Sequence, residues 1–348
     1  MEETPVTPPA ETQPAPGCTN CGNLAVLHGY PTALCSECRD HFTRFPVPKW
    51  LWLFAGAIGI IVLFSLFTLP KNISVGVALE KGIKAEKQHR YLTAQKEFEK
   101  VVQKEPAYME GNGHLMIAAF YNGDFSTMAN AFKQIQGKEI DDHDFYAQLN
   151  DIVTKATSYF RGDSLKEVSA PYDSTGMATP DTVLWRYIRR HEEDTYAKGL
   201  LSYTLFNEKQ YNASDSLLKK LLETDAGNVL ALRIGASLHR EINDYPTSLA
   251  YCDRMLAINQ EDTYAMASKA RTYFKMKNDK EGFRLTLKAL DIASKDGYAI
   301  ATLALGYHLT GDTKKRDELM NRYRNDSSVQ ESMGYVRDVI SKKEFFRN

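Results

Sequence analysis

A repeat of 34 residues, starting at Val75, constrains the fold of this chain more than any other feature of its sequence. The eighth position of the unit is small in five of six units, which lets two helices approach closely. Tyr or Phe recurs at the seventeenth position, and Pro106 stands where the first unit must end a helix. The units start at Val75, Met109, Thr195, Val229, Thr263 and Gly297. The period therefore predicts stacked pairs of antiparallel helices.

This period and pattern resemble the tetratricopeptide repeat (TPR) family. The consensus Trp at the fourth position is absent from all six units, so the shared period carries the resemblance. The resemblance implies an all-α fold, with TPR-like repeats over residues 75–142 and 195–330 and a helix or tail over residues 331–348. Each unit has an apolar face that only its neighbour can cover, so a right-handed solenoid with a concave groove is expected.

Residues 143–194 interrupt the repeat, because they make one unit plus eighteen residues. We expect a helix over residues 144–160, a loop over residues 170–180, and another helix from Trp185 onward. The favoured interpretation is one degenerate repeat with an inserted loop. The alternative is a hinge or insertion that shapes a binding site between a short array and a longer one.

The family geometry implies that positions 2, 5, 9 and 12 of each first helix face the groove. In the four C-terminal units these include Tyr196, Tyr203, Phe206, Arg233, Ser237, Arg240, Tyr264, Arg271, Phe274, Tyr298 and His308. Aromatic rings beside guanidinium groups suit an extended peptide or a carboxylate, since rings stack on the ligand while Arg makes forked hydrogen bonds. The alternative is that Tyr at the second position only packs between repeats. The Lys/Asn carboxylate clamp of chaperone-binding family members is not reproduced.

Four of the five cysteines form two CxxC pairs near the N-terminus: Cys18, Cys21, Cys35 and Cys38. Their spacing allows four thiolates to close a tetrahedron around Zn²⁺. Residues 18–45 therefore resemble a zinc ribbon with a structural Zn²⁺, and two disulfides or a redox CxxC are the alternatives. The Pro-rich residues 1–17 cannot bury enough apolar surface to fold, so a disordered tail is expected there.

Residues 50–69 form an apolar stretch without a charge. As a helix it matches the roughly 30 Å hydrocarbon core of a bilayer, and it is longer than the core of a signal peptide. We therefore predict one transmembrane helix in contact with lipid. Reduced thiolates favour a cytoplasmic head, which would place the chain in a bacterial inner membrane with its TPR tail in the periplasm. The flanking Lys and Arg residues do not decide this orientation.

The sequence favours a binding protein over an enzyme, because its candidate catalytic motifs are incomplete. A formal net charge of −1 argues against a nucleic-acid partner, and no small-molecule substrate is expected. We predict a membrane-anchored TPR adaptor or scaffold that binds a protein or peptide through the Arg/Tyr groove, in the assembly of envelope complexes. One alternative is a transmembrane signalling or regulatory protein with the zinc head as its output module, and another is self-association through the array ends.

Overall fold

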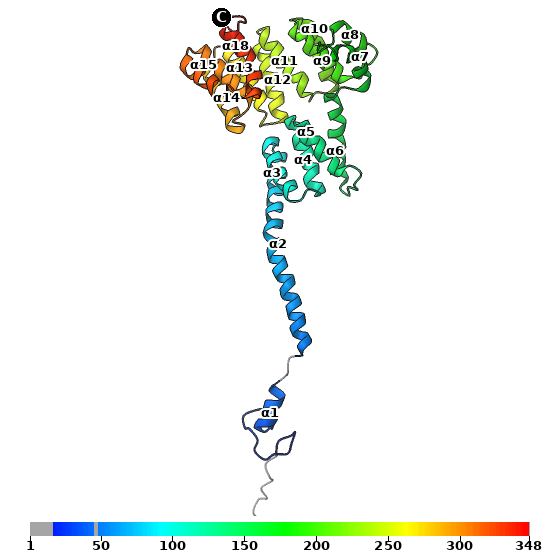
Figure 1. Cartoon of the computed structure of the whole chain (residues 1–348), viewed down its shortest axis with the longest axis vertical. Coiled ribbons are helices and arrows are strands. Elements are labelled where there is room, and N and C mark those ends of the chain that lie inside the picture. Colours follow the sequence, from blue (N-terminus) through cyan, green and yellow to red (C-terminus); the bar gives the residue numbers. More distant parts are fainter. Residues whose placement is uncertain (1–16, 45–47, 348) are drawn as a thin grey trace, which may run out of the picture. The chain divides into compact units, whose positions relative to one another are not determined.

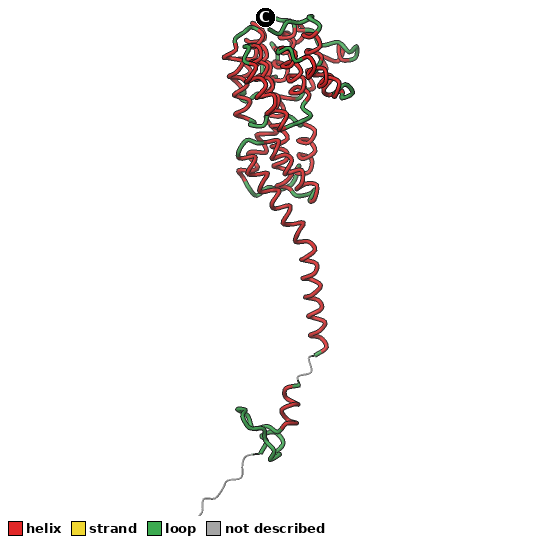
Figure 2. Tube along the Cα trace, turned by 90° about the vertical axis from the view of Figure 1, so that its left-hand side faces the viewer, coloured by secondary structure: helices red, strands yellow, loops and turns green. Residues whose placement is uncertain are grey.

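The computed structural model describes residues 17–44 and 48–347, without the side chains of residues 65–72. The chain divides into two compact units, one up to Pro70 and one from Lys71 onward. Figures 1 and 2 show helices joined by loops, and no strand occurs in the described part of the chain. The predicted tail at residues 1–17 lies outside the described residues, apart from its last one.

The N-terminal unit begins with a loop that holds the first CxxC pair and then enters α1 (Ser36–Thr43). Gly22 has a φ of 76°, and its N–H donates to the carbonyl oxygen of Cys18 at 2.8 Å. Glycine adopts this left-handed conformation without steric cost, which permits the tight turn after Cys21. No strand lies between residues 17 and 44, so a loop and a helix hold the two cysteine pairs in place of paired strands.

Helix α2 (Lys49–Lys87) contains the apolar stretch at residues 50–69. Its first turns expose large side chains, including those of Trp50, Trp52 and Phe64. Side chains 65–69 of the predicted membrane span lie outside the described set. Within the ranges that the structure describes, no helix has both the length and the apolar character needed to cross a membrane.

The second unit keeps the predicted 34-residue period. Its first helices are α4 (Met109–Asn122), α9 (Thr195–Asn207), α11 (Val229–Glu241), α13 (Thr263–Lys275) and α15 (Gly297–Leu309). Its second helices are α3 (Tyr91–Lys104), α5 (Phe125–Ile135), α10 (Tyr211–Thr224), α12 (Tyr245–Ile258), α14 (Asp279–Ile292) and α16 (Thr313–Arg322). Five first helices begin at the predicted residue. In the first 34-residue repeat, α2 continues through Val75 and serves as the first helix.

Asp and Asn side chains cap α9, α11, α13 and α15 at one shared repeat position, whereas Tyr108 before α4 makes no side-chain cap. In these four helices the capping side chain accepts a hydrogen bond from a backbone N–H three residues on, at 2.7 to 3.0 Å. These caps are Asp194, Asn228, Asp262 and Asp296. Each such cap contributes about 1 kcal/mol. Local chemistry that recurs every 34 residues therefore sets where each of these units begins.

Small residues at the eighth position bring paired helices together, as predicted. A Cβ added to Gly82 would overlap the ring of Phe98 in α3. In a later unit the hydroxyl of Ser248 donates to the carbonyl oxygen of Ala236, at 2.7 Å. Both partners of that bond are fully buried, so the close approach also satisfies their polar groups.

Residues 143–194 fold into short helices: α6 (His143–Ala156), η1 (Thr157–Tyr159), α7 (Asp163–Asp173) and α8 (Asp181–Ile188). The predicted helix at 144–160 is confirmed, but the predicted loop at 170–180 was wrong at its start, because α7 continues to Asp173. The Arg161 guanidinium explains the extra turn: it donates to the Ser169 hydroxyl at 2.6 Å and pairs with Asp173. Two short helices, α17 (Ser327–Ser332) and α18 (Gly334–Ile340), end the fold.

The turn before α3 contacts the distant turn between α12 and α13. Glu261 is mostly buried, and its carboxylate accepts from Arg90 Nε at 3.0 Å and from the backbone N–H and hydroxyl of Thr93, both at 2.7 Å. Arg90 is the N-cap residue of α3 and makes no side-chain cap of its own. Glu261 therefore caps α3 from 168 residues away and joins the first hairpin to the C-terminal block.

Candidate functional site

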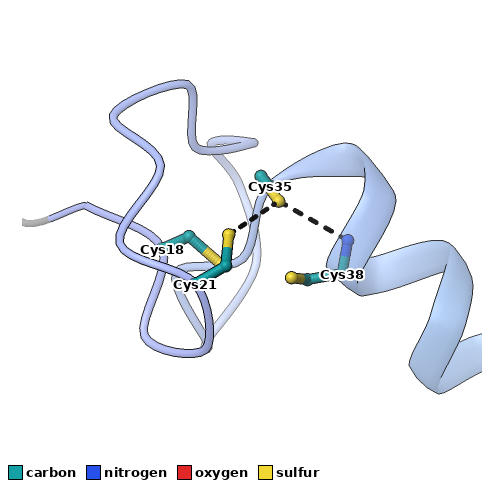
Figure 3. A group of neighbouring side chains, drawn as sticks. All are labelled: Cys18, Cys21, Cys35 and Cys38. Carbon is teal, nitrogen blue, oxygen red and sulfur yellow. Dashed lines mark hydrogen bonds between the residues drawn. The ribbon is translucent and has the colours of Figure 1, made fainter.

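Four cysteine side chains converge in the N-terminal unit (Figure 3). The Sγ atoms of Cys18, Cys21, Cys35 and Cys38 all lie within 4.8 Å of one another, and all four are free thiols. The Cys21 and Cys35 sulfur atoms are 3.6 Å apart. Cys35 is the N-cap of α1, where its Sγ accepts the backbone N–H of Cys38 at 3.5 Å. The helix start thus fixes the second cysteine pair.

The geometry of this cluster suits a divalent cation. A tetrahedron with Zn–S distances of about 2.3 Å has S–S edges of about 3.8 Å, which is close to the 3.6 Å between the Cys21 and Cys35 sulfur atoms. Hydrogen bonds, the first from the Cys35 backbone, lower the pKa of the Cys18 thiol to about 6. A backbone hydrogen bond at Asn23 favours the Cys21 thiolate, but the neighbouring thiols outweigh it and raise the pKa of Cys21 to about 12. Four sulfur ligands leave no open coordination position, so the site fits a structural Zn²⁺.

On the repeats, four predicted groove residues stack in one row, which we call the Arg–Tyr ladder: Arg233, Tyr264, Tyr298 and Arg271. The Arg233 guanidinium carbon lies 4.5 Å from the centroid of the Tyr264 ring. The Tyr264 and Tyr298 rings stack with centroids 4.4 Å apart, and Arg271 lies 3.9 Å from the Tyr298 centroid. The tyrosines therefore pack between repeats and at the same time hold the guanidinium groups by cation–π contacts.

Three arginines on or beside the ladder keep buried nitrogen atoms without a hydrogen-bond partner among residues 17–44 and 48–347: Arg233 Nε, Arg240 Nε and Arg271 Nη2. Other nitrogen atoms of the same groups are paired. Arg240 Nη1 donates to the Ser268 hydroxyl at 3.2 Å, and Arg271 Nε donates to the Thr302 hydroxyl at 2.8 Å. A buried donor without an acceptor costs about 1–3 kcal/mol, so these three atoms add to the free-energy cost of burying the guanidinium groups.

The C-terminal segment, residues 334–347, covers part of this surface. Tyr335 of α18 lies with its ring centroid 5.8 Å from the Arg271 guanidinium carbon. Phe346 is buried, and its ring centroid lies 5.7 Å from Lys275 Nζ. Arg240 and Arg271 are consequently only 5% exposed. The predicted open groove is thus partly filled by the protein's own C-terminus.

Arg347 fixes this segment to the ends of two first helices. Its Nη1 donates to the carbonyl oxygen of Phe274 at 2.7 Å, and its Nη2 donates to that of Leu309 at 3.0 Å. It also pairs with Asp279 through both nitrogen atoms. A cation at helix C-termini is favourable because the last carbonyl groups there carry partial negative charge. From the sequence, only a helix or tail was predicted over residues 331–348. The 34-residue period does not extend to Arg347, so it could not predict these contacts.

The remaining predicted groove residues differ in exposure. Tyr203 is 51% exposed, whereas Tyr196, Phe206 and Ser237 are half-buried. Phe274 is a correction, because it is completely buried and would meet a Cβ at Gly282 at 2.6 Å. Its ring fills the space left by that glycine, so it belongs to the hairpin core.

His308 lies at the far end of the predicted set, in α15. Its Nδ1 lies 3.1 Å from Nη1 of Arg316 in the paired helix α16. Burial, followed by the positive charge of Arg316, lowers the pKa of His308 below its ordinary value. No contact between His308 and the Arg–Tyr ladder is found in the described part of the chain, so the structure does not bring it into that row.

No protein-family model and no curated protein matches the sequence. Similar solved structures include YrrB, a TPR protein with an unusual peptide-binding site, at 9% identity over 68% of this chain and 90% of that chain, with a TM-score of 0.28. Yeast Tom70 matches at 12% identity over 72% of this chain and 60% of that chain, with a TM-score of 0.38. The P58(IPK) TPR domain matches at 12% identity over 89% of this chain and all of that domain (100%), with a TM-score of 0.27. These scores are low, so the repeat fold rests on the chain's own helix register.

Proposed function

We propose that this chain is a non-enzymatic protein-interaction scaffold, whose repeats bind an extended peptide or protein partner. The observation that carries this proposal is the Arg–Tyr ladder, whose Arg233 side chain stays 36% exposed. The ring faces are occupied within the row, so the ring edges and the exposed part of the Arg233 guanidinium would contact another chain, and guanidinium donors favour its carbonyl or carboxylate oxygens. Tyr203 is 51% exposed and the Arg233 side chain 36% exposed, which supports partner binding at these two residues.

The head contributes a structural Zn²⁺ centre of the ribbon-like type. Cys18, Cys21, Cys35 and Cys38 would hold the ion, which neutralises four crowded thiolates and ties the loop to α1. The metal supplies folding free energy to a unit whose described core is small. The head then acts as a separate module on the same chain.

Residues 50–69 hold the scaffold at a bilayer, as the uncharged sequence favours. Trp50 and Trp52 expose amphipathic rings that suit a membrane interface. Because thiolate ligands favour a reducing compartment, the proposal assigns the head to the cytoplasm of a bacterium and the repeats to the periplasm, with a role in the assembly of envelope complexes.

Photo-crosslinking in cells tests the scaffold. One full-length variant carries p-benzoylphenylalanine at Tyr203, and a matched control carries it at Leu287, which is similarly exposed at 52% but lies on the second helix of its unit. We expect a specific partner from position 203 and none from position 287. The same proteins captured from both positions, or none from either, would refute binding at this surface. The compartment of the partner also tests the orientation.

A further inference from the structure

A cavity of about 610 Å³ lies between the first two hairpins and the start of α11. Its walls include five aromatic rings, those of Tyr91, Phe120, Tyr121, Phe125 and Tyr159. At about 30 Å³ for each water, the space corresponds to roughly twenty water molecules. The cavity is partly open to solvent, so a group of a bound chain can enter it between two parts of the array.

The aromatic rings of the cavity hold one another in fixed positions. Tyr91 and Tyr121 stack with centroids 4.3 Å apart, and Phe120 meets the Tyr159 ring edge-on at 5.6 Å. The Tyr159 hydroxyl also accepts the backbone N–H of Val229 at 3.0 Å, which ties this wall to the start of α11. Such rings offer both faces and edges to a further aromatic group.

The charged side chains of the cavity determine which polar group a ligand can carry beside its aromatic ring. Arg233 lines the cavity; its side chain is 36% exposed, and its Nη2 lies 3.7 Å from a carboxylate oxygen of Asp262. Lys155 also lines it, and its ammonium is paired with Asp151 at 2.7 Å. Because both cations already have a carboxylate partner, the cavity favours a neutral ligand group with one hydrogen-bond acceptor over a free anion or cation.

We propose that this cavity takes an aromatic side chain of a partner peptide, whose main-chain carbonyl oxygen accepts a hydrogen bond from the exposed part of the Arg233 guanidinium. The inference rests on the proposed function as a peptide-binding scaffold. It adds that an aromatic residue of the partner peptide determines the specificity of binding. A volume of this size falls within the range of ordinary ligand sites, and its lining matches their apolar walls with few polar groups. The contact between Glu261 and α3 holds the two walls together.

Binding of N-acetyl-tryptophanamide to the full-length protein tests the inference by saturation-transfer NMR. Gly227 lines the cavity, and a Cβ there meets no atom closer than 3.5 Å, so Gly227→Phe is chosen to add a ring to the cavity wall. Gly76→Phe is the matched control, because a Cβ there meets nothing within 4 Å and the residue lies outside the cavity lining. We expect saturable binding with a Kd of about 0.1–1 mM. Gly227→Phe weakens it about tenfold or more, and Gly76→Phe leaves it unchanged.

Two further measurements sharpen the test. Arg233→Gln is expected to weaken the probe about fivefold, as for one lost hydrogen bond. N-acetyl-leucinamide is expected to bind about fivefold more weakly than the tryptophan probe, and equal affinity would refute the preference for an aromatic group. No saturable binding, or equal binding by wild type and Gly227→Phe, would overturn the cavity as a site. Crosslinks from position 203 that persist in Gly227→Phe would then preserve the proposed function without this inference.

Discussion

Replacing Glu261 with Ala tests whether a distant carboxylate holds the first hairpin to the rest of the array. Glu261 accepts three hydrogen bonds, two of them from Thr93 near the start of α3 and one from Arg90. The alanine variant leaves the backbone N–H of Thr93 without its cap. The expected result is therefore local loosening of α3, while the C-terminal block stays folded.

The magnitude follows from the three bonds. Each Thr93 bond to the carboxylate contributes about 1–1.5 kcal/mol. The Arg90 side chain is 46% exposed, so its ion pair adds about 0.5 kcal/mol or less after solvent screening. Glu261→Ala should thus cost about 2–3 kcal/mol, and Glu261→Gln, which keeps one acceptor oxygen, about half of that. In the control Glu281→Ala, only a solvent-screened pair with Arg284 is lost, so its stability should stay close to that of the wild type.

Hydrogen exchange followed by mass spectrometry measures these effects on the full-length chain. A loss of 2–3 kcal/mol corresponds to amide exchange in α3 that is about 30 to 150 times faster. Amides in α15 should keep their wild-type rates. Unchanged exchange in α3 of Glu261→Ala, or equal acceleration in α3 and α15, would refute the reasoning that this contact is a local latch.

Three further predictions concern other parts of the chain. The wild-type protein should bind one Zn²⁺ per chain by elemental analysis. Cys38→Ser should lower the affinity for Zn²⁺, because one of four thiolates is lost. Equal zinc content of the wild type and Cys38→Ser under chelator challenge would contradict the site. Gly82→Val should cost about 1–3 kcal/mol in urea unfolding, because its side chain overlaps the Phe98 ring. A wild-type midpoint would disprove close packing there. Hydrogen bonds from the Thr247 hydroxyl, and then from its backbone N–H, lower the pKa of Asp244 below 3.8. The Asp244 carboxylate therefore stabilises the fold above about pH 4, and this stabilisation is lost as the pH falls through the lowered pKa. The urea midpoint of Asp244→Asn should decline less steeply than that of the wild type from about pH 4 to 2, and an equal decline would refute this role.

Much of the repeat array could be predicted from the sequence, because its signals are local. Asp194 and its equivalents cap helices within three residues along the chain, and the small residue at Gly82 faces a helix of its own hairpin. The cysteine cluster follows similarly from two short CxxC turns and the helix start at Cys35. The Tyr and Arg positions of the ladder follow from the period, since one repeat position returns to one face of the stack.

Only the tertiary structure decided which part of the groove stays open. Phe346 and Arg347 carry no periodic signal, yet they pack over the first helices and leave Arg271 almost fully buried. Glu261 meets α3 across 168 residues, and the aromatic cavity exists because those two turns dock. Capping and helix period act over a few residues, whereas such contacts depend on where the stacked repeats bring distant turns together.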